Sequence, residues 1–235
     1  MEKQGDLNDL KVLTENDTVV VESEFLKVED IKSKYVYHFI KRLIDILGSV
    51  FGLLVMSPLF LVIAIAIKKE EKNGTVFFSQ IRIGKNGEKF KMYKFRSMCL
   101  DAEDKLIELL KYNEIEGAMF KMKDDPRITN IGKFIRKTSI DELPQLLNVL
   151  KGDMSLVGPR PPLEREVKEY QAYDKQRLLI KPGCTGVWQI SGRNNVGFNE
   201  MIEMDINYIK NMTIREDFKI ILKTIRVMIK PNGAY

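Results

Sequence analysis

The chain has 235 residues, a length that suits one domain, or one domain with a membrane anchor, and that can bury a hydrophobic core. Its mean hydropathy of −0.19 and its 30% of charged residues exclude a membrane protein with many spans. Two cysteines without a C-x-x-C spacing exclude a disulfide framework, and a single histidine, His38, excludes a His-rich metal site.

Charge is unevenly distributed along the chain. Residues 1–30 carry nine acidic side chains and three lysines, a net charge of −6, without a clear hydrophobic periodicity. We interpret residues 1–36 as a loosely ordered acidic extension. Because the whole chain carries +5, the other 205 residues carry +11. Such a basic body indicates an anionic partner: nucleic acid, an anionic membrane surface or a phosphorylated substrate.

The first strong structural signal is an uncharged apolar segment over residues 46–67. As a helix its 22 residues would measure roughly 33 Å, enough to cross a hydrocarbon core of about 30 Å. It starts too far into the chain for a signal peptide and lacks the small-residue cleavage site. A buried core helix is the alternative, but an apolar run of this length favours contact with a membrane.

Pro58 predicts a break near the middle of this segment, because proline has no amide donor and its ring clashes with the carbonyl of Leu54. The adjacent Ser57 hydroxyl is a candidate partner for the freed backbone groups. Basic residues flank the segment on both sides: Lys41, Arg42, Lys68, Lys69 and Lys72. Positive flanks favour the cytoplasmic face, so a hairpin that enters and leaves by one face fits; from these residues alone, a tilted single span fits equally well.

After the apolar segment the pattern predicts short strands followed by helices, an α+β fold. Residues 76–78 and 90–95 have strand character, and the turn residues at 84–87 between them, which include an Asn-Gly pair, predict a β-hairpin. A polar helix is expected over residues 101–116.

Residues 139–142 resemble a capping box and are followed by leucines at helical spacing, which predicts a helix that begins here. Proline is tolerated only in the first turn of a helix. Pro144 therefore places Asp141 and Glu142 at the N-terminus of this helix.

Two loops rich in glycine and proline follow, over residues 152–162 and 181–193, and two helices are expected over 198–210 and 214–230. In the last helix an apolar face lies beside a stripe of basic residues: Lys219, Lys223, Arg226 and Lys230. This pattern fits a helix on an anionic membrane surface, and a core helix with a solvated basic face is the alternative.

Asp141 and Glu142 are the strongest candidates for chemistry. In an ordinary protein such acids cap a helix and interact with its dipole. Here Lys94, Arg136 and Arg160 lie in neighbouring motifs, and carboxylates among fixed cations indicate a phosphate site with a divalent metal. One carboxylate would hold Mg²⁺, and the other could act as a nucleophile.

At this point the sequence resembles the bacterial sugar transferases, the monotopic polyprenyl-phosphate phosphoglycosyl transferases. Four motifs carry the resemblance: KFRSM at 94–98, TSIDELPQ at 138–145, NVLKGDMSLVGPRP at 148–161 and KPGCTGVWQISGRN at 181–194. The likeness runs from about residue 41 to residue 230 and leaves residues 1–36 outside it. We expect a small member that consists of the catalytic module, without the extra membrane-spanning N-terminal domain of the large members.

The resemblance implies roles for individual residues. Asp141 would be the nucleophile and Glu142 the Mg²⁺ ligand. Arg160, the arginine of Pro-Arg-Pro, would bind substrate phosphate. Lys94 and Arg136 are assigned to phosphate binding on the weaker ground of charge and proximity to the motifs.

The resemblance also implies a topology. Residues 37–72 would form a re-entrant membrane helix that breaks at Ser57-Pro58, with both ends on the cytoplasmic face of the bacterial inner membrane. Residues 73–235 would form a cytosolic phosphoglycosyl transferase module, mostly helical, with a small β-hairpin and interfacial amphipathic helices.

The implied reaction transfers a sugar-1-phosphate from a nucleotide diphosphate sugar, usually a UDP-sugar, to undecaprenyl phosphate and releases UMP. The product would start a capsule, an exopolysaccharide, a lipopolysaccharide O-antigen or a glycoprotein glycan, and glycosyl transferases would act after it. Nucleic acid is not an expected partner. Two alternatives are a membrane-anchored basic adaptor without catalysis and a glycosyl transferase that releases UDP.

Overall fold

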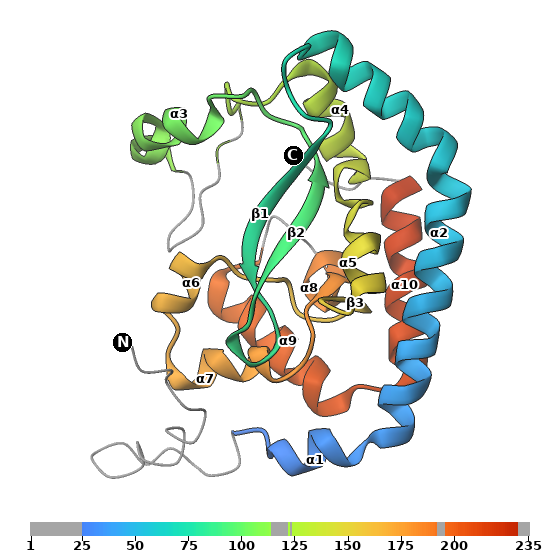
Figure 1. Cartoon of the computed structure of the whole chain (residues 1–235). Helices are drawn as coiled ribbons and strands as arrows, with labels where there is room; N and C mark the ends of the chain where they lie inside the picture. Colours follow the sequence, from blue (N-terminus) through green and yellow to red (C-terminus); the bar gives the residue numbers. More distant parts are fainter. Residues whose placement is uncertain (1–24, 114–121, 123, 192–195, 230–235) are drawn as a thin grey trace, which may run out of the picture.

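The computed structural model describes residues 25–113, 122, 124–191 and 196–229, and it is a mostly helical body beside one long helix (Figure 1). The helices in chain order are α1 Val28–Ser33, α2 Tyr35–Glu70, α3 Ala102–Leu109, α4 Asn130–Lys137, α5 Gln145–Lys151, α6 Glu164–Lys168, α7 Ala172–Lys175, α8 Val187–Ser191, α9 Phe198–Asn211 and α10 Ile214–Ile229. The strands are β1 Phe77–Ile83, β2 Lys89–Phe95, β3 Ser155–Val157 and β4 Gly183–Thr185. The α+β class expected from the sequence is confirmed.

The end of the expected acidic extension is folded. Residues 1–24 lie outside the described residues, but α1 begins at Val28 and buries Ile31 in a core cluster with Tyr208 and Ile209 of α9. The backbone N–H of Leu26 also donates to Gln176 Oε1 at 2.6 Å. Residues 25–36 are therefore not loosely ordered, because their apolar side chains pack on the body, while the boundary at residue 36 stays a prediction.

The expected break at Ser57-Pro58 is absent: α2 is one continuous helix of 36 residues with Pro58 inside it. The reason is local. Pro58 cannot donate to the Leu54 carbonyl, but the Ser57 hydroxyl donates to that same carbonyl at 2.8 Å, so the carbonyl keeps a partner. The helix bends at its upper, blue-green part without reversing (Figure 1).

The body holds α2 near its start through buried polar contacts. Lys41 Nζ lies 2.8 Å from Asp217 Oδ2 at the start of α10. Arg42 donates to the carbonyl oxygens of Val149 and Leu150, at 2.6 and 2.9 Å, and thereby satisfies groups in the last turn of α5. These contacts fix the start of α2 against two helices of the body.

The body also holds the far end of α2. Ile63 and Ile67 are buried against Phe95 of β2 and Ile135 of α4. The Glu70 carboxylate accepts the backbone N–H groups of Asn130 and Ile131, at 2.7 and 2.9 Å, in the first turn of α4. Both ends of α2 are therefore docked on the same body.

The outer side of α2 is apolar and exposed along the length of the helix. Tyr35 and Phe39 near its start, Leu54 in its middle and Leu61 beyond the bend are 63–75% exposed. Within the described residues, α2 is the only helix that is long and apolar enough to cross a membrane. Such a continuous apolar strip on a charged protein indicates contact with lipid or with another protein.

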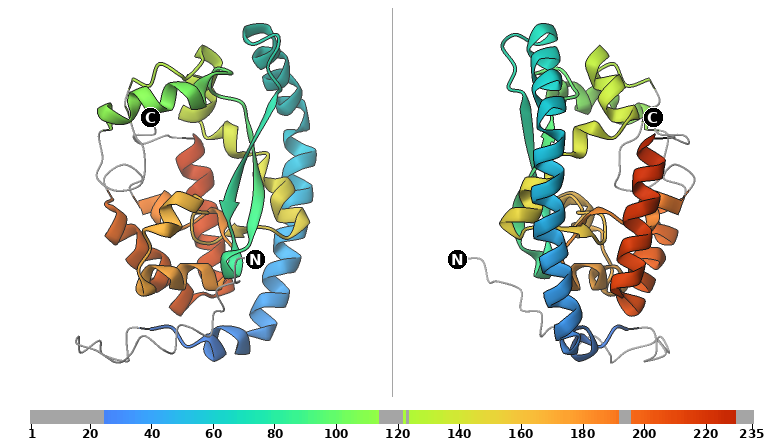
Figure 2. Two further views of the ribbon diagram at one scale, coloured as in Figure 1. Left: turned by 60° about the vertical axis from the view of Figure 1, so that its left-hand side comes forward. Right: turned by 90° about the vertical axis from the view of Figure 1, so that its right-hand side faces the viewer.

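The last helix runs along the same side of the molecule as α2 (Figure 2). Helices α9 and α10 match the two closing helices predicted from the sequence to within one residue at each end. Phe218, Leu222 and Ile225 of α10 are 49–65% exposed, which leaves apolar side chains beside its basic residues uncovered. The exposed faces of α2 and α10 together form the apolar side of the molecule.

Two small sheets position the loops of the site. The predicted hairpin is confirmed as the antiparallel pair β1–β2, with Phe77 opposite Phe95 and a turn in which Asn86 and Gly87 have positive φ. The two glycine-rich loops expected from the sequence contribute an unexpected parallel pair, β3–β4, in which Ser155 lies opposite Gly183.

Candidate active site

Asp141 and Glu142 lie on a 3-10 turn, Ile140–Glu142, between α4 and α5. The expectation that they begin a helix with a Ser139 cap was wrong, because Ser139 has a left-handed backbone (φ 57°) and α5 starts only at Gln145. Pro144 explains the difference: without an N–H it cannot continue the turn, so the helix restarts after it.

Lys94 joins the acidic pair from the end of β2, as the sequence proposed. Its Nζ lies 2.7 Å from Oε1 of Glu142, and both side chains are partly exposed. Asp141 is more deeply placed, with 7% of its surface exposed. The turn thus presents one buried carboxylate and one that is paired with a cation.

The electrostatics of Asp141 differ from those of an ordinary aspartate. Its pKa is raised to about 6: burial and the charge of Glu142 raise the pKa, and Lys94 and Arg136 partly oppose this rise. Arg136, at the end of α4, therefore lies within electrostatic range of the acidic pair. At neutral pH Asp141 is ionised but more basic than usual, which suits a nucleophile.

Arg160 lies in the loop after β3. Gly158 N–H donates to Thr185 O, and Gly183 N–H donates to Pro159 O, both at 2.9 Å, so the parallel pair fixes the start of this loop. Arg160 itself pairs with the buried Glu166 at 3.0 Å. The charges of Arg160 and Glu142 both shift the pKa of Arg82. Arg160 therefore lies near the group of charged side chains that includes Glu142 and Lys94.

Arg82 of β1 lies within electrostatic range of Glu142 and Arg160 and was not predicted from the sequence. It is 9% exposed, and it donates to Pro161 O at 3.0 Å and to Gln80 Oε1 at 2.9 Å. An arginine within a short amphipathic strand gives no signal by itself. Its burial depends on the Arg160 loop, which folds over it from about 80 residues further along the chain.

Ser57 and Pro58 are exposed on α2 and do not join the acidic pair. The next residues do approach it, because Leu59 and Phe60 pack against the core cluster to which Ile140 also belongs. Ile140 directly precedes Asp141. The bend of α2 therefore lies beside the turn that carries the two carboxylates.

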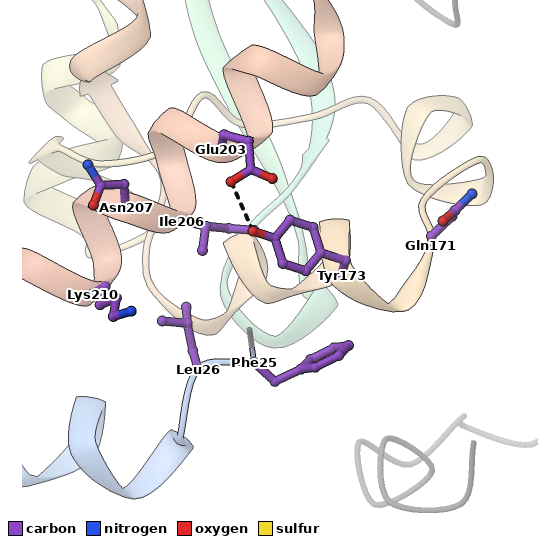
Figure 3. A pocket seen from close by; sticks show the side chains of 8 residues that line it. All are labelled: Phe25, Leu26, Gln171, Tyr173, Glu203, Ile206, Asn207 and Lys210. Atoms are coloured by element: carbon purple, nitrogen blue, oxygen red, sulfur yellow. Dashed lines mark hydrogen bonds between the residues drawn. The ribbon is translucent and has the colours of Figure 1, made fainter. Parts of the chain in front are cut away.

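A separate hollow of about 610 Å³ lies at the other end of the body, between α7, α9 and the segment before α1 (Figure 3). Leu26, Tyr173 and Lys210 are among its lining residues, and the Tyr173 hydroxyl donates to Glu203 at 3.0 Å. This hollow contains none of the residues that the sequence assigned to chemistry.

Comparison with known proteins decides the family. Residues 36–231 match the family model described as bacterial sugar transferase. The chain belongs to the bacterial sugar transferase family. The resemblance proposed from the four sequence motifs is confirmed.

Individual relatives cover most of the chain. The galactosyl transferase CpsE of Streptococcus agalactiae is 52% identical over 86% of this chain and 44% of its own length. The undecaprenyl-phosphate galactose phosphotransferase of Salmonella typhimurium is 43% identical over 89% of this chain and 44% of its own length. The chain therefore spans less than half of these two relatives. The exopolysaccharide production protein ExoY of Rhizobium meliloti is 42% identical and is matched over 88% of its length.

Proposed function

We propose that this bacterial sugar transferase transfers a sugar-1-phosphate from a UDP-sugar to undecaprenyl phosphate. The observation that carries the proposal is the buried carboxylate of Asp141, placed among Glu142, Lys94 and Arg136 and next to the bend of α2. Two anionic substrates can meet there only if fixed cations offset their charge. The similarity to the undecaprenyl-phosphate galactose phosphotransferase of Salmonella typhimurium supports the acceptor.

In the first step an Asp141 oxygen attacks the phosphorus that carries the sugar. The bond from that phosphorus to the UMP oxygen breaks, UMP leaves with the electron pair, and a phosphosugar remains on the carboxylate. In the second step an oxygen of undecaprenyl phosphate attacks the same phosphorus and releases Asp141. The product, undecaprenyl diphosphate-sugar, would then be extended by glycosyl transferases into a capsule, exopolysaccharide or related glycan.

The acidic pair fits a Mg²⁺ ion that is shared with the substrate. Glu142 is partly exposed and paired with Lys94, while Asp141 is deeper and more basic. Proteins usually hold Mg²⁺ through one or two carboxylates together with substrate phosphates. Bound Mg²⁺ would neutralise charge on the diphosphate, and Glu142 would hold and orient it.

We also propose that the protein is monotopic and sits on the cytoplasmic face of the inner membrane. Both ends of α2 dock on one body that contains buried charges, through Lys41 at the start and Glu70 at the end. Since charges are costly in hydrocarbon, this docking supports a helix whose two ends stay on one side. The exposed strip of α2 and the basic, apolar face of α10 would then enter one leaflet of an anionic membrane.

The released nucleotide tests the proposed reaction. Full-length protein in nanodiscs, given a panel of UDP-sugars, Mg²⁺ and undecaprenyl phosphate, should release UMP in proportion to the diphosphate-linked lipid product. Release of UDP would indicate a glycosyl transferase instead. If neither nucleotide is released but the protein binds anionic lipid, it would be an adaptor. Its lipid binding should then be lost in salt and be unaffected by chelator.

Accessibility of the two ends of α2 tests the topology. In a variant with Cys99 and Cys184 replaced by serine, single cysteines at Tyr35 and at Lys69 should both resist a membrane-impermeant maleimide in intact spheroplasts of a bacterial host. Both should react once the membrane is opened. Labelling of one end in intact spheroplasts would show that α2 spans the bilayer, and an exposed cysteine at Glu108 in α3 serves as the cytoplasmic reference.

A further inference from the structure

Arg82 is a buried cation that has no carboxylate of its own among the described residues. Its two terminal nitrogens donate to neutral oxygens, those of Pro161 and Gln80, and its Nε is buried without any partner. Burying a charge is costly unless an opposite charge accompanies it, and a buried donor without a partner adds to that cost. Arg82 therefore lacks an anion.

The carboxylates near Arg82 are already engaged. Glu166 accepts from Arg160 at 3.0 Å and from the Leu163 N–H at 2.8 Å, and Glu142 pairs with Lys94. Burial and the positive charge of Arg160 lower the pKa of Arg82 to about 10, although the negative charges of Glu166 and Glu142 oppose this shift. Arg165 adds a further repulsive charge. An additional negative charge beside Arg82 and Arg160 would therefore be stabilised.

We propose that Arg82 binds the phosphate that leaves with the nucleotide, together with Arg160. The inference rests on the proposed function, since it assigns a part of that donor site. Lys94, Glu142 and Asp141 lie at the phosphorus that reacts, and Arg82 lies in electrostatic contact with both Glu142 and the Arg160 loop. A phosphate at this place would accept the free Nε–H of Arg82 and remove the repulsion between the two arginines.

The alternative is that Arg82 only clamps the Arg160 loop. The backbone contacts make this a real alternative, because Arg82 donates to Pro161 O and Ile83 N–H donates to Pro162 O at 2.9 Å. If Arg82 were only a clamp, its loss would lower the stability of the loop and would not change a direct contact with phosphate. The experiment must therefore separate charge from packing.

The first measurement is UMP binding to the full chain in nanodiscs by calorimetry, which needs no turnover. Arg82→Met should weaken UMP binding by roughly 10- to 100-fold, the range expected for a lost charge-assisted contact. Lys89→Met is the matched control, because it removes the same charge from the same hairpin at an exposed ion pair with Glu164. The control should bind UMP within twofold of the unchanged protein.

The second measurement is the pH dependence of UMP binding in Arg82→Lys. A lysine there would meet the same burial and the same repulsion from Arg160, so its pKa would fall below the ordinary value of about 10.5. UMP affinity should therefore fall as the pH rises from 7 to 9 in Arg82→Lys, while the unchanged protein keeps its affinity over this range. A structural clamp would lower the melting temperature over the same pH range, whereas a phosphate contact lowers UMP affinity alone.

The outcomes are distinct. A folded Arg82→Met variant with normal UMP affinity overturns the proposal. If Arg82→Met does not fold, a flat pH profile in Arg82→Lys with normal affinity overturns it equally. Arg82-dependent UMP binding without any UMP release from UDP-sugars in the unchanged protein supports the phosphate site and contradicts the proposed reaction, so the two can fail separately.

Discussion

Asp141→Asn should abolish the covalent phosphosugar adduct and lower turnover by several orders of magnitude, because the amide keeps the shape of the side chain but is not an anionic nucleophile. With a UDP-sugar, Mg²⁺ and no lipid acceptor, the unchanged protein should release up to one UMP per chain and gain the mass of one phosphosugar. Intact-protein mass spectrometry and peptide mapping would locate the added mass on Asp141.

Two controls accompany this experiment. Asp104→Asn in α3 changes an exposed aspartate outside the site and should leave the adduct intact. Adduct formation should also fall as the pH drops below about 6, because the buried Asp141 carboxylate becomes protonated there. An adduct on another residue, or full turnover in Asp141→Asn, would contradict the assignment.

The same substitution should not destabilise the fold. The pKa of Asp141 is higher in the folded protein than the ordinary value of 3.8, so its ionised form disfavours folding above pH 6 and this penalty disappears as the pH falls. Asparagine removes the penalty at neutral pH. An unchanged or raised melting temperature would show that lost turnover reflects lost chemistry.

Gly183→Ala should unfold the loop that carries Arg160 and eliminate activity. A Cβ at Gly183 would lie 2.1 Å from the backbone nitrogen of Gly158 and 2.4 Å from the Thr185 oxygen. These backbone atoms cannot move aside without breaking the β3–β4 pair. We expect a cost of about 3 kcal/mol, which corresponds to a fall in melting temperature of roughly 10 °C.

Gly197→Ala is the matched control for this substitution. Gly197 precedes α9, and a Cβ there would have no heavy atom within 4 Å, so we expect a cost of about 1 kcal/mol or less from the helix cap alone. Thermal unfolding and UMP release would be measured for both variants. If Gly183→Ala matched Gly197→Ala in stability and activity, the close packing of the two loops would not be needed for the site.

Much of the candidate site could be proposed from the sequence because its residues lie in short local motifs. Asp141 and Glu142 are adjacent, and Lys94, Arg136 and Arg160 lie within recognisable motifs. The hairpin and the last two helices follow from the Asn-Gly turn and from helical spacing. These features depend on neighbours in the chain, which a sequence displays directly.

The features that were wrong or missed depend on choices that the sequence leaves open. A proline can occupy the first turn of a helix or the position just before the helix starts. Pro144 occupies the position just before α5, and only the packed structure shows this. Pro58 either breaks a helix or bends it, and the hydrogen bond from Ser57 to the Leu54 carbonyl favours the bend. Arg82 is buried only because a distant loop covers it.

The hydrogen bonds from Arg42 to α5 have a mechanical consequence. Helix α5 has seven residues, about 10 Å, and the acidic pair lies just before its first turn, while Arg42 grips its last turn. A helix of two turns is too short to bend appreciably along its length. A tilt of α2, or its movement along the membrane normal, would therefore move α5 and with it Asp141. The lipid around α2 would in this way affect the position of the Asp141 carboxylate.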